Sequence, residues 1–203
     1  MISSKKIELL KIWKNNLFSV FSISEIMKKT NKKTKTWIFN SLNELSKKKL
    51  IQIQQKGNIN LYSLNLKNPI LENTLQYIDL QDINPQLLQI MEEIIENVPI
   101  KTYCLLVFGS YAENKQTKDS DMDICFLIEN EKTKKIIEPF IKEIKLNYTI
   151  EIDEQYITFD EFVEMLLNNE ENLGKQIFKN NKLFFNPNIY FQLLKEAYKH
   201  GFR

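Results

Sequence analysis

Runs of apolar residues divide the middle of the chain into short strands separated by polar segments. Residues 103–108 are apolar throughout, which predicts a buried strand. Residues 121–128 contain an apolar residue at every second position from Met122, and this predicts another strand after a polar, turn-forming segment. A third strand is expected within residues 148–157. The pattern therefore predicts a small sheet in the second half of the chain.

Apolar residues at helical spacing surround these strands. They recur three and four positions apart before, between and after the strands, which indicates helices that cover the sheet. The last of these helices form a helical C-terminal tail, whose aromatic side chains we assign to core or dimer packing rather than to base stacking. The expected helices span residues 69–82, 85–98, 132–145, 159–167, 173–178 and 189–198.

The first third of the chain follows a different order of elements. Helix, short strand, two helices and a hairpin in succession resemble a winged helix-turn-helix domain. The helix before residue 30 is expected to be capped by Ser22 or Ser24. The expected elements are a helix over residues 6–14, an extended run over 18–21, helices ending at 29 and spanning 32–50, and strands over 51–54 and 59–64.

Charge separates this first third from the rest of the chain. The whole chain carries +2, but residues 1–67 hold 14 lysines and 3 glutamates, a formal charge of +11, which leaves −9 for the remainder. Such a positive charge favours a nucleic-acid partner, and the winged-helix resemblance implies double-stranded DNA. A role in dimerisation or protein docking is the alternative, because a fold does not determine its function. The resemblance implies contacts to phosphates or bases from Lys32, Lys33, Lys35 and Asn40 in a major groove, and from Lys56 on the wing.

A short motif joins the first two predicted strands of the second half. Gly109 and Ser110 end the first strand, and Asp121-Met122-Asp123 begins the next after ten intervening residues. Glycine allows a sharp turn, and a helix beginning near Ser110 offers N–H groups and a hydroxyl to phosphate oxygens. The two aspartates lie on one face of their strand, about 7 Å apart, and can share hard cations.

This motif is similar to the signature of the DNA polymerase beta superfamily, and most of all to its minimal nucleotidyltransferases. The resemblance covers about residues 86–186. It implies that Gly109 and Ser110 bind a nucleoside triphosphate and that Asp121 and Asp123 bind two Mg²⁺ ions. The implied reaction transfers a nucleoside monophosphate, preferably AMP from ATP, to a hydroxyl of a protein, an RNA or a small molecule. Many relatives of this kind are antitoxins that modify a partner toxin.

The same resemblance implies a third carboxylate on a neighbouring strand, which completes a metal site and helps to deprotonate the attacking hydroxyl. Glu151 and Asp153 are both candidates, since residues two apart on a strand point the same way. We prefer Asp153, because its distance from the helix expected near Phe159 fits the strand-to-helix connection of the family better.

One departure from the family pattern bears on activity. Many minimal nucleotidyltransferases have Arg-Gly where this chain has Glu113-Asn114. Asparagine can adopt the left-handed conformation that glycine supplies, so the turn is expected to be preserved. The charge of Glu113 opposes triphosphate binding unless Lys115, Lys118 or the metal ions offset it. The alternative function is therefore a DNA-binding regulator in which this domain is an inactive nucleotide sensor or a dimerisation scaffold.

The chain is thus expected to be an α+β protein in three parts. These are a winged helix-turn-helix domain at residues 1–67, a helical connector at 68–85, and a mixed-sheet nucleotidyltransferase domain with its helical tail at 86–203. No apolar run approaches the length of a membrane span and the N-terminus lacks a signal-peptide pattern, so we expect a cytoplasmic protein without a membrane partner. Cys104 and Cys125 fall within expected core strands and are interpreted as small buried residues.

Overall fold

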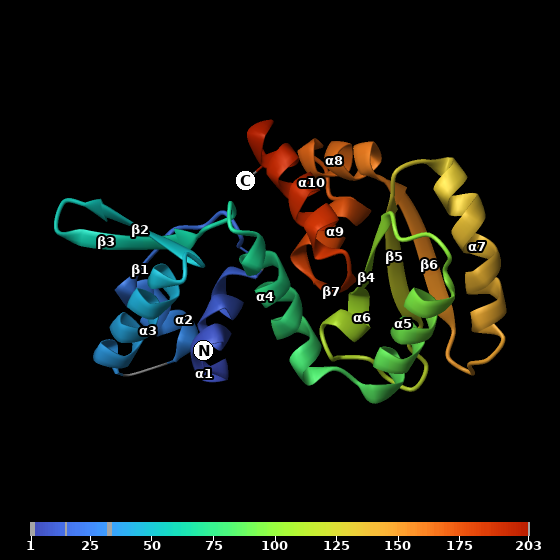
Figure 1. Ribbon diagram of the computed structural model, residues 1–203, viewed down its shortest axis with the longest axis horizontal. Helices are drawn as coiled ribbons and strands as arrows, with labels where there is room; N and C mark the ends of the chain where they lie inside the picture. Colours follow the sequence, from blue (N-terminus) through green and yellow to red (C-terminus); the bar gives the residue numbers. More distant parts are fainter. Residues whose placement is uncertain (1–2, 15, 32–33, 203) are drawn as a thin grey trace. The chain divides into compact units, whose positions relative to one another are not determined.

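The chain forms two compact units, each with its own sheet (Figure 1). The computed structural model describes residues 3–14, 16–31 and 34–202. The first unit spans Met1–Ile78 and the second Asp79–Arg203. This confirms a mixed α+β protein with two sheets and flanking helices. No helix in the described part of the chain is long and apolar enough to span a membrane.

The first unit packs short helices around a three-stranded antiparallel sheet of order β1-β3-β2. Its helix α2 begins at a capping box, in which the Ser22 hydroxyl accepts from the Glu25 N–H and the Glu25 carboxylate accepts from the Ser22 N–H. Trp13 is fully buried and its indole N–H donates to the Ser19 carbonyl at 3.0 Å. The elements are α1 (Ser4–Ile7), the 3-10 helix η1 (Glu8–Trp13), β1 (Phe21–Ser22), α2 (Ile23–Thr30), α3 (Lys35–Lys47), β2 (Ile51–Lys56), β3 (Ile59–Leu64) and α4 (Pro69–Asp79).

Three expectations for this unit need correction. The extended run expected over residues 18–21 is a strand of only two residues, Phe21–Ser22, because only this part pairs with β3. The helix expected over 32–50 is shorter, since α3 begins at Lys35 and ends before Lys49, which has a left-handed φ of 58°. The hairpin is longer than expected, with β2 and β3 paired up to Lys56 and Ile59.

The second unit is built on a mixed four-stranded sheet of order β6-β5-β4-β7. Strands β5 and β6 are parallel, whereas β4 runs antiparallel to both β5 and β7. Its strands are β4 (Tyr103–Phe108), β5 (Met122–Ile128), β6 (Ile152–Thr158) and β7 (Asn181–Phe185). Its helices are η2 (Leu80–Asp82), α5 (Pro85–Asn97), α6 (Gly109–Ala112), α7 (Glu131–Lys145), α8 (Phe159–Leu167), α9 (Leu173–Lys179) and α10 (Pro187–Lys199).

Helices cover both faces of this sheet (Figure 1). Alternate residues of β4 and β5, such as Leu105 and Phe126, pack into a core with buried residues of α5 and α7. The intervening residues, among them Cys104 and Cys125, are buried on the opposite face, where α8 and α10 contact the sheet. Both cysteines are free thiols, as expected. The acidic motif therefore starts on a strand whose remaining length is packed on both faces.

The C-terminal tail is not entirely helical, and this corrects the sequence-based expectation. Residues 181–185 form β7, which pairs antiparallel with β4 through partners such as Val107 and Lys182. This pairing gives hydrogen-bond partners to the backbone N–H and C=O groups along the edge of β4 that faces away from β5. The apolar run over 182–185 is therefore a strand of the sheet.

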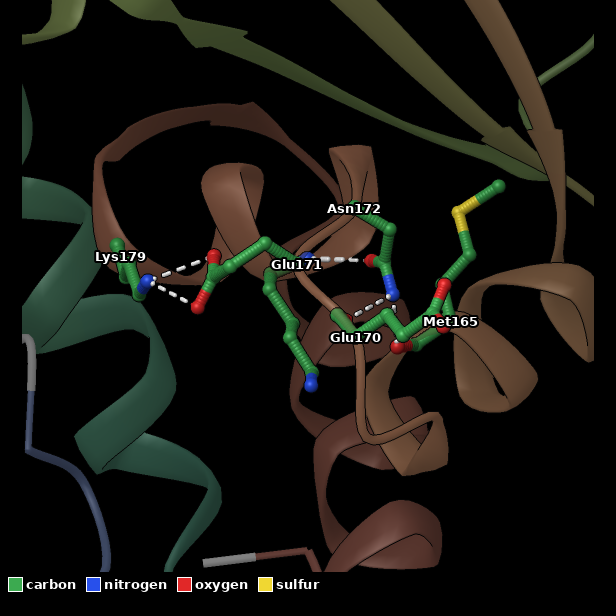
Figure 2. Close-up of polar contacts among 6 residues, drawn as sticks. Met165, Glu170, Glu171, Asn172 and Lys179 are labelled. Atoms are coloured by element: carbon green, nitrogen blue, oxygen red, sulfur yellow. Dashed lines mark hydrogen bonds and ion pairs between the residues drawn. The ribbon is translucent and has the colours of Figure 1, made fainter.

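The connection between α8 and α9 is held by a cluster of polar contacts (Figure 2). The Asn172 amide donates to the carbonyls of Met165 at 2.7 Å and Glu170 at 3.1 Å, and its Oδ1 accepts from a backbone N–H of α9. Glu171 and Lys179 form an ion pair at 2.8 Å. These contacts fix α9, and through it the point at which β7 begins.

Candidate active site

Gly109 directly follows β4 and lies against the carboxylate of Asp123. Its φ of +64° is left-handed, and a Cβ on this residue would lie 2.1 Å from Oδ2 of Asp123. No other residue fits at this separation without moving the strand or the carboxylate. Helix α6 begins at Gly109 and is a single turn of four residues. The Gly-Ser motif and the Asp-x-Asp motif are therefore packed together through Gly109 and Asp123.

Three aspartates gather at the adjoining ends of β5 and β6. Asp123 is the second residue of β5, and Asp121 immediately precedes the strand. Asp153 on β6 is the register partner of Asp123 across the parallel pair. Residues directly opposite on neighbouring strands present their side chains on one face of the sheet. The structure thus brings Asp153 to the motif from a strand about thirty residues further along.

The two candidates for the third carboxylate differ in their placement. Asp153 lies within β6 opposite Asp123, and its carboxylate accepts from the Gln155 amide at 3.1 Å. Glu151 lies before the strand, where its backbone carbonyl accepts from the Met122 N–H at 2.8 Å and its side chain is exposed. This register is a reason to keep Asp153 as the preferred third carboxylate.

The carboxylates of the site repel one another. Burial raises the pKa of Asp123 above its ordinary value, and the negative charges of Asp153 and Asp121 raise this pKa further. Burial also raises the pKa of Tyr111, and the charge of Asp121 adds to that shift. Such mutual repulsion is relieved when a cation or a proton enters the cluster.

Residues 100–190 match the family model described as "Polymerase beta, Nucleotidyltransferase". This part of the chain is a polymerase beta-type nucleotidyltransferase domain. The matched segment begins just before β4 and ends within α10, so it includes the whole second sheet, Gly109 and the three aspartates. No curated protein matches the chain. The first unit lies outside the matched residues.

The donor set of the nucleotidyltransferase domain suits a hard cation. Carboxylate oxygens are the ligands that Mg²⁺ prefers, and Asp123 and Asp153 are placed opposite each other. Within the described residues, no group of three or more His, Cys, Asp or Glu side chains is arranged as a single metal site. Asp123 and Asp153 therefore fit a hard divalent cation such as Mg²⁺ by their chemistry and by the register of their strands.

The turn after α6 keeps the conformation expected for the family despite its different sequence. Asn114 has a left-handed φ of 55°, as the substitution of glycine by asparagine led us to expect. The carboxylate of Glu113 pairs with Lys115 at 2.5 Å, which offsets part of its charge. Both side chains are substantially exposed, so this pair contributes little to stability. Glu113 is thus partly neutralised where the family often has arginine.

A buried lysine near this turn was not identified from the sequence. Lys182 on β7 is only 5% exposed, and its ammonium donates to the Tyr111 carbonyl at 3.3 Å and to the Asn114 side-chain oxygen. The available signal was a lysine at the start of the apolar run over 182–185, in a chain whose other lysines are mostly on polar surfaces. Only the aromatic side chains of the C-terminal tail entered the sequence-based prediction.

The residues proposed to contact DNA are placed on the first unit as follows. Lys35 is the exposed first residue of α3, and Asn40 is exposed on the same helix beside Phe39, which is 43% exposed. Lys56 is exposed at the end of β2, next to the hairpin turn. Lys32 and Lys33 lie outside the described residues.

The raised pKa of Asp123 predicts a pH-dependent effect of Asp123→Asn on stability. Because the folded state raises this pKa, it binds more protons than the unfolded state between the ordinary value of 3.8 and the raised value. Stability from this group therefore falls as the pH rises through that window. We expect Asp123→Asn to raise the thermal unfolding midpoint of the domain at neutral pH, and the gain to shrink on acidification toward the ordinary pKa. A gain that is equal at all pH values would contradict the prediction.

Proposed function

We propose that the chain is an Mg²⁺-dependent nucleotidyltransferase that moves a nucleoside monophosphate, preferably AMP from ATP, to a hydroxyl group of a protein, an RNA or a small molecule. The observation that supports this most directly is the contact between Gly109 and Asp123, with Asp153 opposite in register. The contact joins an anion-binding turn to a carboxylate cluster. These are the two parts that handling a triphosphate requires.

Each residue of the site has a role in this proposal. The backbone of Gly109 and the hydroxyl and N–H of Ser110 hold the triphosphate at the end of β4. Asp121, Asp123 and Asp153 would bind two Mg²⁺ ions, which neutralise charge on the transferred phosphoryl group. Asp153 accepts the proton of the attacking hydroxyl, because a carboxylate close to that hydroxyl can act as its general base.

The first unit extends the proposal to DNA. Its order of elements, with α2 and α3 followed by the β2–β3 hairpin, supports a winged helix-turn-helix domain. In this proposal α3 enters a major groove and the hairpin is the wing. The charge of +11 over residues 1–67 supports a double-stranded DNA partner.

A regulator without transferase activity is the second candidate. It is favoured by Glu113, whose carboxylate stands where many relatives have arginine and where a positive charge would assist triphosphate binding. In this case the nucleotidyltransferase domain binds a nucleotide as a signal or serves as a dimerisation scaffold. DNA binding by the first unit is then the main activity.

Label transfer tests the first candidate against the second. The purified protein is incubated in lysate with Mg²⁺ and each radiolabelled nucleoside triphosphate, with EDTA as a control. We expect label on one acceptor class, identified by its sensitivity to protease or nuclease, or by its small size. A toxin protein and an RNA are among the acceptors that this assay distinguishes. Nucleotide binding without transfer to any acceptor would support the sensor instead.

The same assay separates the two candidates for the third carboxylate. We expect Asp153→Asn to reduce transfer by about a hundredfold, the usual contribution of a positioned general base. Glu151→Gln should change it only a few-fold, because Glu151 lies before β6, whereas Asp153 is the register partner of Asp123. The reverse order of effects would assign the role to Glu151.

DNA binding is tested with charge-reversal variants of the described lysines. We expect Lys35→Glu plus Lys56→Glu to weaken binding of a labelled duplex at least about tenfold and to reduce the slope of log affinity against log salt by about two. Fluorescence anisotropy at several salt concentrations measures both quantities. Lys132→Glu plus Lys135→Glu on the exposed face of α7 changes the net charge equally and serves as the control. A wild-type protein without salt-sensitive DNA affinity would contradict the proposal.

A further inference from the structure

Lys182 reaches the Gly-Ser turn from a distant part of the sequence. It lies on β7 opposite Val107, two residues before Gly109. Its side chain is almost completely buried, and its ammonium donates to the carbonyl of Tyr111 and to the side-chain oxygen of Asn114. An ammonium group is retained in such a place only where it is well hydrogen-bonded, because removing it from water is unfavourable.

The turn that Lys182 contacts cannot hold its conformation unaided. Helix α6 has four residues, and a single helical turn in isolation is unstable. Its last carbonyls lack intrahelical partners, and that of Tyr111 accepts from both Lys182 and the Asn114 N–H, the latter at 3.4 Å. A positive charge is favourable at this C-terminal end of the turn. The left-handed conformation of Asn114 is unfavourable, and a hydrogen bond to its side chain can offset this cost.

We infer that Lys182 is a positioning residue for nucleotide binding, which clamps the turn over residues 109–114 so that Gly109 stays against Asp123 and Ser110 faces the triphosphate. The inference rests on the proposed function for its effect on nucleotide, but the clamp itself can be measured without activity. Lys182 reaches the C-terminal end of the turn, whereas the phosphate-binding groups of Gly109 and Ser110 lie at its start. It therefore acts through the turn and does not contact the substrate.

The test compares Lys182→Met, which keeps the length of the side chain and removes the ammonium, with Lys182→Arg, which keeps a buried cation. We expect Lys182→Met to raise KM for the nucleoside triphosphate about tenfold, with a much smaller change in kcat, as for a lost charged hydrogen bond. Lys182→Arg should restore part of the affinity. Hydrogen exchange of the amides of residues 109–115 should be faster in Lys182→Met, while exchange in β5 and β6 is unchanged.

Two further variants keep the inference testable if Lys182→Met fails to fold. Asn114→Gly preserves the left-handed backbone and removes one of the acceptors of Lys182, so we expect it to raise KM and to speed exchange in the turn. Lys145→Met is the matched control, because it removes the partly buried ammonium that pairs with Glu154 at 2.6 Å on the other side of β5. It should leave both readouts unchanged.

The outcomes separate the inference from the proposed function. Folded Lys182→Met and Asn114→Gly variants with wild-type exchange over 109–115 would overturn the positioning role, whatever the activity. If the wild type transfers no nucleotide, the proposed function fails, and hydrogen exchange still decides whether Lys182 holds the turn. Faster exchange without any change in nucleotide affinity would overturn the inference that the clamp serves binding.

Discussion

Replacing Asp121 and Asp123 together by asparagine is expected to abolish nucleotide transfer and to leave the nucleotidyltransferase domain folded. Asp121 directly precedes β5 and Asp123 is its second residue, where burial, together with the charges of Asp153 and Asp121, raises the pKa of Asp123. Asparagine keeps the shape of the side chain and removes the charge that binds cations. We expect a loss of about a thousandfold or more, as for several kcal/mol of charge stabilisation in the transition state.

Label transfer and thermal unfolding of the same preparation check this expectation. Asp119→Asn plus Glu129→Gln is the matched control, because these exposed residues flank β5 and removing them changes the net charge by the same amount. The control should transfer label at the wild-type rate. Transfer by the Asp121 and Asp123 variant near the wild-type rate would exclude the proposed mechanism. Loss of folding in that variant would show instead that the carboxylates are structural.

Gly109→Ala is expected to inactivate the domain and to destabilise it. Alanine at a φ of +64° is strained by about 1–2 kcal/mol, and its Cβ would lie 2.1 Å from the Asp123 carboxylate. Since that overlap is relieved only by moving the turn or the aspartate, we expect a total destabilisation of about 2 kcal/mol or more and a loss of transfer of at least about a hundredfold. Thermal unfolding and label transfer measure the two effects.

Gly57→Ala provides an unusually close comparison for this variant. Gly57 has a φ of +58°, almost the same as that of Gly109, but no atom lies within 4 Å of the position that a Cβ would occupy there. We expect Gly57→Ala to lower the free energy of unfolding of the first unit by about 1–2 kcal/mol, from backbone strain alone. This variant should transfer label normally. Equal effects at the two glycines would mean that the contact with Asp123 has no special importance.

The sequence predicted those elements whose structure is determined by residues close together in the chain. The apolar run of β4 and the alternation in β5 were identified, and the cap of α2 was narrowed to Ser22 or Ser24, because each is encoded within a few neighbouring residues. The Gly109 and Asp123 motif was identified by its spacing. That a Cβ at position 109 would overlap the Asp123 carboxylate emerged only from the folded chain.

The features that the sequence did not reveal all depend on distant pairing. Strand β7 was assigned to a helical tail because its partner, β4, lies more than seventy residues earlier. Burial of Lys182 follows from that pairing, so no local pattern marks it. The preference for Asp153 over Glu151 was argued from loop length, whereas the register of β6 on β5 gives a direct reason for it. The helix expected from residue 32 begins at Lys35 as α3, because local patterns define the ends of helices poorly.

The pairing of β7 with β4 also has a consequence for the order in which the protein assembles. Lys182 contacts Tyr111 and Asn114 across separations of 71 and 68 residues, whereas Gly109 and Asp123 are close neighbours in the chain. Contacts between near neighbours form sooner than distant ones, because closing a long loop is entropically unfavourable. During synthesis the Gly-Ser turn emerges well before Lys182, the residue that we infer to hold it. Under the proposed function, we therefore expect competence to bind nucleotide to be acquired late, when the second unit has almost completely folded.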